Sequence, residues 1–316
     1  MTRIVKSNSA KWSFSKWPFS SSVAHATSTS ASAANWPAHA RQQRALSESE
    51  SAWWRYGSWL TGSALLLCAL ALCLPRMPVP ASYHAFADQM TWGVLPHARD
   101  VLSNAAFALA GWVLWWQGRR YVRCMPDEAA RQRLASALRV SAWGLVLTAL
   151  CSGIYHLQPD ARGLMIDRIG MSMAFAGVVG VLVADRFAPV RVVPAMAAAL
   201  LLGVACAVGD FLHNNTMPWV LFQLGVVLLM LLAPWVTRDA GTHRLGQPAV
   251  LGVAWWQVLA FYALAKLCEM GDHALWHWTG EIISGHSLKH IAAAAAVWPI
   301  VRALRQRALA ARTQGQ

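Results

Sequence analysis

The chain has 316 residues, of which 56% are hydrophobic and only 13% are charged, and its formal net charge is +13. A soluble globular domain of this length is less apolar, so the composition excludes that class and favours an integral membrane protein. The six cysteines are scattered and form no CxxC pair, which indicates neither a disulfide framework nor a zinc ribbon.

Residues 1–56 form the first predicted segment, which is rich in serine and alanine and has no acidic residue before Glu48. This composition predicts a disordered cytoplasmic extension, with a transit peptide as the alternative. An apolar run at 57–74 follows. We interpret it as an N-terminal transmembrane helix or signal anchor, and a cleaved signal sequence is the other interpretation because positive charge precedes the run.

Seven further apolar runs approach the ~20 residues that cross a bilayer as a helix. They lie at 101–117, 137–156, 164–184, 190–208, 217–236, 249–268 and 286–303. The sequence therefore predicts an all-α integral membrane protein. Its parts are a seven-helix transmembrane core within 83–303, one extra N-terminal helix and a basic cytoplasmic tail at 304–316.

Basic residues predict the orientation of these helices, because cytoplasmic loops carry an excess of lysine and arginine. Positive charge gathers before the first helix, in every second loop and in the C-terminal tail: Arg3, Lys6, Lys11, Lys16, Arg41, Arg44, Arg55, Arg119, Arg120, Arg123, Arg131, Arg133, Arg186, Arg191, Arg238, Arg244, Arg302, Arg305, Arg307 and Arg312. Both termini are then cytoplasmic. This arrangement explains most of the net charge, so nucleic-acid binding is not required.

Polar residues near the outer ends of the predicted helices are the candidates for function, because ionisable groups at membrane depth are costly. They form three groups along the chain: Ser152, His156 and Asp167; Lys266, Glu269, Asp272 and His273; and His286 with His290. The last two histidines are four residues apart and so share one helix face. The predicted topology brings all three groups to the outer side.

Three histidines from two distant segments can therefore converge at one depth, as His156, His286 and His290. Three protein ligands with a fourth position open to water are typical of a catalytic zinc site. Asp167 and Ser152 are near enough in sequence to reach the same water or to orient a ligand ring.

Each residue also has a purely structural interpretation. The Ser152 hydroxyl can bond to the preceding helical turn, and Asp167 can pair with Arg168 at a helix start. Lys266, Glu269 and Asp272 can form an ion-pair network at the membrane interface. Spacing alone does not decide between these interpretations and a metal site.

The order and spacing of these residues resemble a known family. Ser152-x-x-x-His156, Asp167 eleven residues later, and His286-x-x-x-His290 at the start of the last helix are similar to the alkaline ceramidases, in the superfamily of the adiponectin and progestin receptors. "DVLSNAAFALAG" from Asp100 also resembles the Ser-Asn that opens their first core helix. The resemblance spans about residues 83–303 and implies a Zn²⁺ site at His156, His286 and His290.

The resemblance implies a hydrolase that splits the linear amide of a ceramide-like N-acyl lipid into a fatty acid and a sphingoid base. Zinc lowers the pKa of a bound water to about 7. Asp167 is then placed to accept the water's proton and return it to the amine, and Ser152 is a hydrogen-bond donor to the oxyanion. A site toward the periplasmic or lumenal side suits a substrate whose acyl chain stays in the bilayer.

The chain departs from the family at its calcium site, which precedes the first core helix. Calcium takes six to eight oxygen ligands, whereas "HAFADQMTWGVLPHARD" offers only the carboxylates of Asp88 and Asp100. These two residues are the candidates for Ca²⁺, and too few ligands are visible to predict the ion. Glu269 and Asp272 are candidates for orienting the zinc ligands.

Two other classes of protein remain open at the level of sequence. A receptor or signalling protein on the same scaffold would keep a structural zinc, and a transporter would use the outer polar residues as an ion relay. A haem protein is less favoured, because His286 and His290 share one helix face, whereas axial ligands face each other across a bundle.

Overall fold

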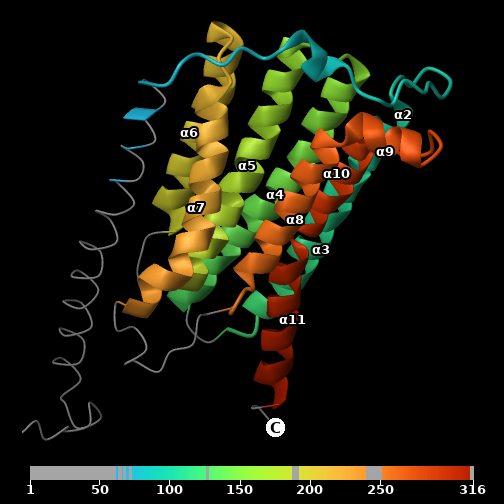
Figure 1. Cartoon of the computed structure of the whole chain (residues 1–316). Helices are drawn as coiled ribbons and strands as arrows, with labels where there is room; N and C mark the ends of the chain where they lie inside the picture. Colours follow the sequence, from blue (N-terminus) through green and yellow to red (C-terminus); the bar gives the residue numbers. More distant parts are fainter. Residues whose placement is uncertain are drawn as a thin grey trace, which may run out of the picture. The chain divides into compact units, whose positions relative to one another are not determined.

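Helices form all the named regular elements that the computed structural model describes (Figure 1). The structure describes residues 62, 66, 69, 70, 73–125, 128–186, 192–239 and 251–313, with the backbone alone at 234–239 and 312. All of them belong to one unit, which spans residues 48–316. The predictions for 1–56, and most of those for 57–74, lie outside the described residues.

The elements follow one another in this order: η2 (Ala81–His84), α2 (Ala98–Ser103), α3 (Ala105–Val122), α4 (Glu128–Leu157), α5 (Ala161–Arg186), α6 (Val192–His213), α7 (Met217–Asp239), α8 (Trp255–Met270), α9 (Asp272–Trp278), α10 (Gly285–Ala295) and α11 (Trp298–Thr313). An all-α fold is therefore confirmed. Three of the described helices, α4, α5 and α6, are long and apolar enough to cross a membrane, and Met217–Ala233 is a shorter apolar stretch.

Two predicted spans are each divided into two helices. The span at 101–117 consists of α2 and α3, which meet at Asn104, and the span at 286–303 consists of α10 and α11. The C-terminal residues are helical as far as Thr313, and α9 is a short helix that the hydrophobic pattern did not predict. The α4–α5 boundary agrees with the prediction, since α4 ends two residues before Pro159, which disfavours helical backbone in the residue before it.

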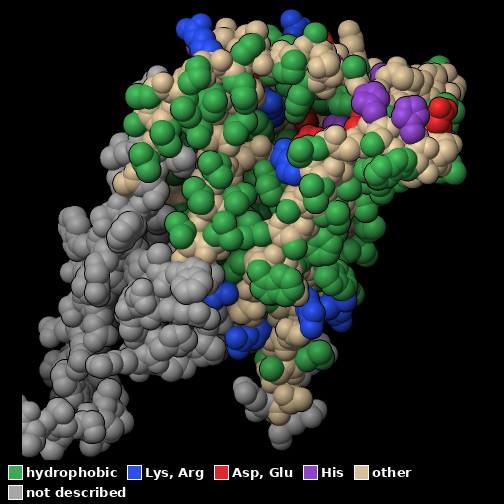
Figure 2. Space-filling view, in the orientation of Figure 1, with side chains coloured by type: hydrophobic (Ala, Val, Ile, Leu, Met, Phe, Trp, Pro, Cys, Tyr) green, Lys and Arg blue, Asp and Glu red, His purple; other side chains and the backbone are tan. Residues whose placement is uncertain are grey.

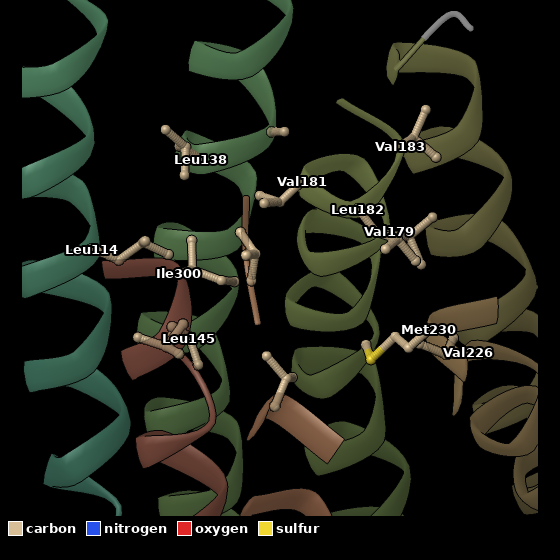
Figure 3. Packing of buried hydrophobic residues seen from close by; sticks show 14 of the residues in the cluster. Leu114, Leu138, Leu145, Val179, Val181, Leu182, Val183, Val226, Met230 and Ile300 are labelled. Atoms are coloured by element: carbon tan, nitrogen blue, oxygen red, sulfur yellow. The ribbon is translucent and has the colours of Figure 1, made fainter. Parts of the chain in front are cut away.

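The helices pack as a bundle that closes on itself. Consecutive helices from α3 to α8 are in contact, and both α10 and α11 return to α3. Apolar side chains from α3, α4, α5, α7 and α11 meet in the interior (Figure 3). Leu114, Val181 and Ile300 are completely buried there. Helix α10 also contacts α2, and α2 contacts α4, which carries the first candidate histidine.

Two buried acidic residues fix the helices around the interior. The carboxylate of Asp185 accepts hydrogen bonds from the backbone N–H groups of Leu251 (3.0 Å) and Gly252 (2.8 Å) and from the indole N–H of Trp255 (2.9 Å). This anchors the start of α8 to the end of α5. Asp210 of α6 pairs with Arg168 of α5. The predicted alternative, an Arg168 pair with Asp167, is not the ion pair that forms.

Glycines allow α4 and α5 to approach closely. A Cβ atom built on Gly177 would lie 2.3 Å from the Cα atom of Ser141, and one on Gly144 would lie 2.4 Å from the backbone nitrogen of Ala174. Small residues at such contacts are typical of helices that pack inside membranes. The contact is important for the site because α4 and α5 carry His156, Ser152 and Asp167.

We predict that Gly177→Ala forces α4 and α5 apart and lowers the free energy of unfolding by about 1–3 kcal/mol, the usual cost of overpacking. Gly153→Ala is the matched control, because it lies on α4 with no atom within 4 Å of the added Cβ. It should be neutral or stabilise by up to about 1 kcal/mol. Thermal denaturation of the purified protein measures both variants, and equal melting temperatures would contradict the close contact.

Candidate metal centre

The three predicted histidines meet at the end of the bundle where α4 ends and α10 begins. His156 lies in the last turn of α4, and His286 and His290 lie in the first two turns of α10. The start of α10 is fixed by Ser284, whose hydroxyl accepts a hydrogen bond from the backbone N–H of Ser287 (2.8 Å). A serine at this position caps the free N–H groups of a helix start. The structure thus confirms the predicted convergence.

The three rings are close enough together to hold one metal ion. One ligand atom from each histidine lies within 4.8 Å of the others, and no other group of three or more His, Cys, Asp or Glu residues in the described ranges is arranged in this way. The ring centroid of His156 is 4.7 Å from that of His286 and 5.0 Å from that of His290. All three side chains are buried.

Four ring nitrogens in this cluster are buried without a hydrogen-bond partner: Nδ1 and Nε2 of His156, Nε2 of His286 and Nε2 of His290. Leaving such a group unpaired costs about 1–3 kcal/mol each. A metal ion that accepted a lone pair from each ring would remove that cost for three of the four nitrogens, and one nitrogen of His156 would keep no hydrogen-bond partner among the described residues. The donor set fits zinc, which takes imidazole nitrogens at ~2.0–2.1 Å and often only three protein ligands, although nitrogen ligands alone do not identify the metal.

Ser103 of α2 sets which nitrogen of His290 faces the cluster. Its Oγ lies 2.7 Å from Nδ1 of His290 and donates a hydrogen bond to the carbonyl oxygen of Asp100 at 2.8 Å. The Ser103 hydroxyl has a single proton and donates it to that carbonyl, so Oγ can only accept a hydrogen bond from His290. The Nδ1–H of the ring is therefore the donor, and the free lone pair of the neutral ring is on Nε2. No role was predicted for Ser103, and the Ser-Asn resemblance at 103–104 was the only sequence signal for it.

Asp88 and Asp100, the calcium candidates, hold α2 and α10 in place. Asp88 accepts hydrogen bonds from the backbone N–H groups of Arg99 (2.9 Å) and Asp100 (3.1 Å) at the start of α2. Asp100 Oδ1 accepts from the hydroxyl groups of Ser284 (2.6 Å) and Ser287 (2.7 Å) on α10. These contacts engage the carboxylates in positioning the histidine helix, and we propose no calcium ion there.

The two residues expected to orient the ligands have different roles. Asp272 Oδ1 accepts a hydrogen bond from the backbone N–H of His286 (2.8 Å), and its Oδ2 accepts from that of Ala87 (3.0 Å). Asp272 therefore fixes the backbone of a ligand rather than its ring. Glu269 instead pairs with Lys266 and Lys289.

Phe86 covers the histidines at the end of the bundle. Its ring centroid lies 4.7 Å from that of His156 and 4.3 Å from that of His286, and the side chain is only 5% exposed. The segment that carries it crosses the upper ends of the helices (Figure 1). His84 ties this segment to α4, because its Nδ1 lies 2.8 Å from the Tyr155 hydroxyl. Burial lowers the pKa of His84, which favours the neutral ring.

A cavity of about 170 Å³ lies beside the cluster, and Ser152, Asp167 and His290 all line it. The Ser152 hydroxyl is placed to donate a hydrogen bond to the Asp167 carboxylate, while Asp167 Oδ1 is buried without a partner. Helices α5, α7, α8 and α10 supply mostly apolar walls, among them Met171, Phe175, Val226, Leu259 and Ala293. Three of the five residues predicted for catalysis and metal binding therefore line one cavity, and the other two, His156 and His286, adjoin it through His290.

Comparisons with known protein families, with curated proteins and with solved structures found no match for this chain. The arrangement of the site therefore carries any functional conclusion by itself.

We predict that Ser103→Ala weakens metal binding by about 10–100-fold, since partners of a ligand histidine typically contribute that much. His156→Ala should remove stoichiometric metal altogether. Ser136→Ala is the control, because its hydroxyl bonds only to the carbonyl of Arg133 on an exposed part of α4. Chelator competition followed by elemental analysis measures the affinities. Wild-type affinity in both Ser103→Ala and His156→Ala would exclude the assignment.

Proposed function

We propose that this chain is a zinc-dependent membrane hydrolase that cleaves the amide bond of a ceramide-like N-acyl lipid, related to the alkaline ceramidases. One observation carries the proposal. Three buried histidines with unpartnered nitrogens lie beside a mostly apolar cavity, and a carboxylate and a hydroxyl, Asp167 and Ser152, line that cavity.

The proposed membrane arrangement has seven spanning segments in the described part of the chain, formed by α3, α4, α5, α6, α7, α8 and the α10–α11 pair, preceded by the expected N-terminal helix. Three cation–aromatic contacts favour a membrane boundary at the end opposite the histidines, since arginine and tryptophan gather at such boundaries. These are Arg119 over Trp115 (4.5 Å), Arg120 over Trp116 (4.4 Å) and Arg305 over Trp298 (5.2 Å). Figure 2 shows basic side chains near the start of α11.

The arginine asymmetry of the loops orients this bundle with both termini in the cytoplasm and the histidines toward the outer side. Asp160 and Gln132 are exposed at opposite ends of the bundle. A cysteine at Asp160 should react with an impermeant thiol reagent from outside, and one at Gln132 should not. The reverse labelling would place the site in the cytoplasm.

Amide hydrolysis requires a proton acceptor, an oxyanion donor and a binding surface for the acyl chain. A zinc ion in such a site lowers the pKa of water to about 7 and polarises a carbonyl. Asp167 accepts a proton from the attacking water and returns it to the amine nitrogen when the C–N bond breaks. The Ser152 hydroxyl donates to the carbonyl oxygen as negative charge develops on it.

The walls of the cavity favour a lipid as the substrate. Phe175, Val226 and Leu259 are among the apolar side chains that line it, whereas the polar groups lie around Asp167. An acyl chain can therefore lie against apolar walls while its amide reaches the polar end. Phe86 covers the other side of the cluster and limits the access of bulk water.

A structural zinc in a receptor-like protein is the second candidate. The observation that favours it is the depth of burial, because His156 is completely buried beneath Phe86. Structural zinc sites are closed, whereas catalytic ones keep an open position. Stoichiometric zinc with no hydrolysis of any acyl amide would support this second function.

We predict that Asp167→Asn keeps zinc and the fold but hydrolyses a fluorescent N-acyl lipid about 10²–10⁴-fold more slowly, because asparagine cannot take up the proton. Ser152→Ala should lose up to about 10²–10³-fold in kcat. Gln223→Ala, on another wall of the cavity, controls for altered packing. A wild-type rate in Asp167→Asn across a range of pH would show that the carboxylate is not the base.

A further inference from the structure

Three charged side chains in the cavity are not used by the proposed reaction. Lys266 and Glu269 of α8 and Lys289 of α10 line the same space as Ser152 and Asp167. Glu269 joins the two lysines, with Oε2 at 2.7 Å from the Lys266 amine and Oε1 at 3.0 Å from that of Lys289. Figure 2 shows basic and acidic side chains together within an otherwise apolar face. A neutral lipid amide gives no reason for this cluster.

The cluster has more positive charge than its own carboxylate neutralises. Each ammonium group has three N–H donors, and the structure pairs one donor of Lys266 and one of Lys289 with Glu269. Charged groups at this depth are costly and point to a function. The Lys289 side chain is only 20% exposed, so solvent screens its charge weakly.

Asp167 is the other acidic residue in the cavity, and it is the proposed proton acceptor. Neither lysine forms an ion pair with Asp167 among the described residues, so the second positive charge of the pair has no counterpart in direct contact among the residues that line the cavity. An anionic group on the substrate would supply that counterpart. The acyl chain contains no such group, so the charge must be on the amine half of the molecule.

We propose that Lys289 and Lys266 select N-acyl lipids whose amine half carries a carboxylate or phosphate close to the amide. The inference rests on the proposed function, because the position of the amide is taken from Ser152 and Asp167. Lys289 lines the same cavity as Ser152, Asp167 and His290, so an anion bound by its amine shares that space with the reacting amide. Glu269 positions both lysines and also competes with the ligand for their donors.

Calorimetric titration of the full-length purified protein in detergent tests this selectivity. All four ligands have the same dodecanoyl group. Among the three amides, N-dodecanoylglycine carries a carboxylate on its amine half, N-dodecanoylphosphoethanolamine carries a phosphate there, and N-dodecanoylethanolamine is uncharged. Dodecanoate, the free fatty acid, carries its carboxylate at the acyl end instead. The two anionic amides should bind at least about tenfold more tightly than the neutral amide, because charge-assisted hydrogen bonds are the stronger ones. The comparison between carboxylate and phosphate identifies the preferred anion.

Variants separate recognition of the anion from packing. Lys289→Gln should abolish the preference while the neutral amide binds as before. Glu269→Gln should increase the preference, because both lysines gain a free donor, whereas a purely structural Glu269 would leave the ratio unchanged. Gln223→Leu, an uncharged position in the same cavity, should change the affinity for all ligands alike. If Lys289→Gln does not fold, Lys266→Gln provides the test, since that side chain is 42% exposed.

Equal binding of neutral and anionic amides by the wild type, or a preference that survives in both lysine variants, would overturn the inference. Dodecanoate binding as tightly as the anionic amides would also overturn it, because the lysines would then recognise the acyl carboxylate. Failure of the proposed function gives a different result: the binding preference holds, but no amide is hydrolysed. Hydrolysis of the neutral amide without any binding preference contradicts the inference alone.

Discussion

A ring nitrogen buried inside a helical bundle must find its partner within that bundle, and at one end of this bundle four histidine nitrogens have no partner among the residues that the structure describes. Unpaired polar groups are expensive in a dry interior. The free-energy cost of these unpaired nitrogens falls on His156 of α4 and on His286 and His290 of α10, two segments more than a hundred residues apart in the sequence. One metal ion could take a nitrogen from each of the three rings together, and the neighbouring contacts hold the rings in place for it.

Much of the surrounding structure keeps these rings in place. Asp100 binds two serines of α10, Asp272 binds the backbone of a ligand, and Ser103 fixes one ring tautomer. Arg168 is paired with Asp210, which leaves the adjacent Asp167 directed to the cavity rather than to its neighbour. The acidic residues near the site thus divide between those that anchor helices and those that line the cavity. Asp167 and Glu269 are the two that line the cavity.

The sequence predicted the helical class and the convergence of the histidines, because hydrophobic run length and helix direction determine which ends meet. Spacing of four residues was sufficient to place His286 and His290 on one face. The hydrophobic pattern of the sequence could not predict the break between α10 and α11 or the short helix α9, because both depend on packing against α3 and α8. The roles of Ser103 and Phe86 were also inaccessible, since both contacts join residues far apart in the chain.

Partner choice among charged residues was the other limit of the sequence. Arg168 follows Asp167 directly, and an interaction between neighbours was a reasonable alternative, yet the guanidinium pairs with Asp210 of α6. Glu269 was a candidate for orienting a zinc ligand, with an ion-pair network of Lys266, Glu269 and Asp272 as the alternative. The Lys266–Glu269 pair of that alternative forms, but the further partner of Glu269 is Lys289, which was not predicted. Such pairings depend on the rotation of α5, α6, α8 and α10 about their own axes. Hydrophobic periodicity predicts which broad face of a helix is buried, but it does not predict the rotation finely enough to identify the partner of a single side chain.

X-ray absorption spectroscopy of the purified protein at the zinc edge tests the metal centre most directly. We expect about one zinc per chain, with three imidazole nitrogens at ~2.0–2.1 Å and one further light-atom ligand. Loss of the imidazole scattering in a protein with His286 and His290 both replaced by alanine would assign the ligands to α10. A stoichiometric zinc with sulfur ligands, or no bound metal in a folded and fully reconstituted protein, would exclude the proposed three-histidine zinc site.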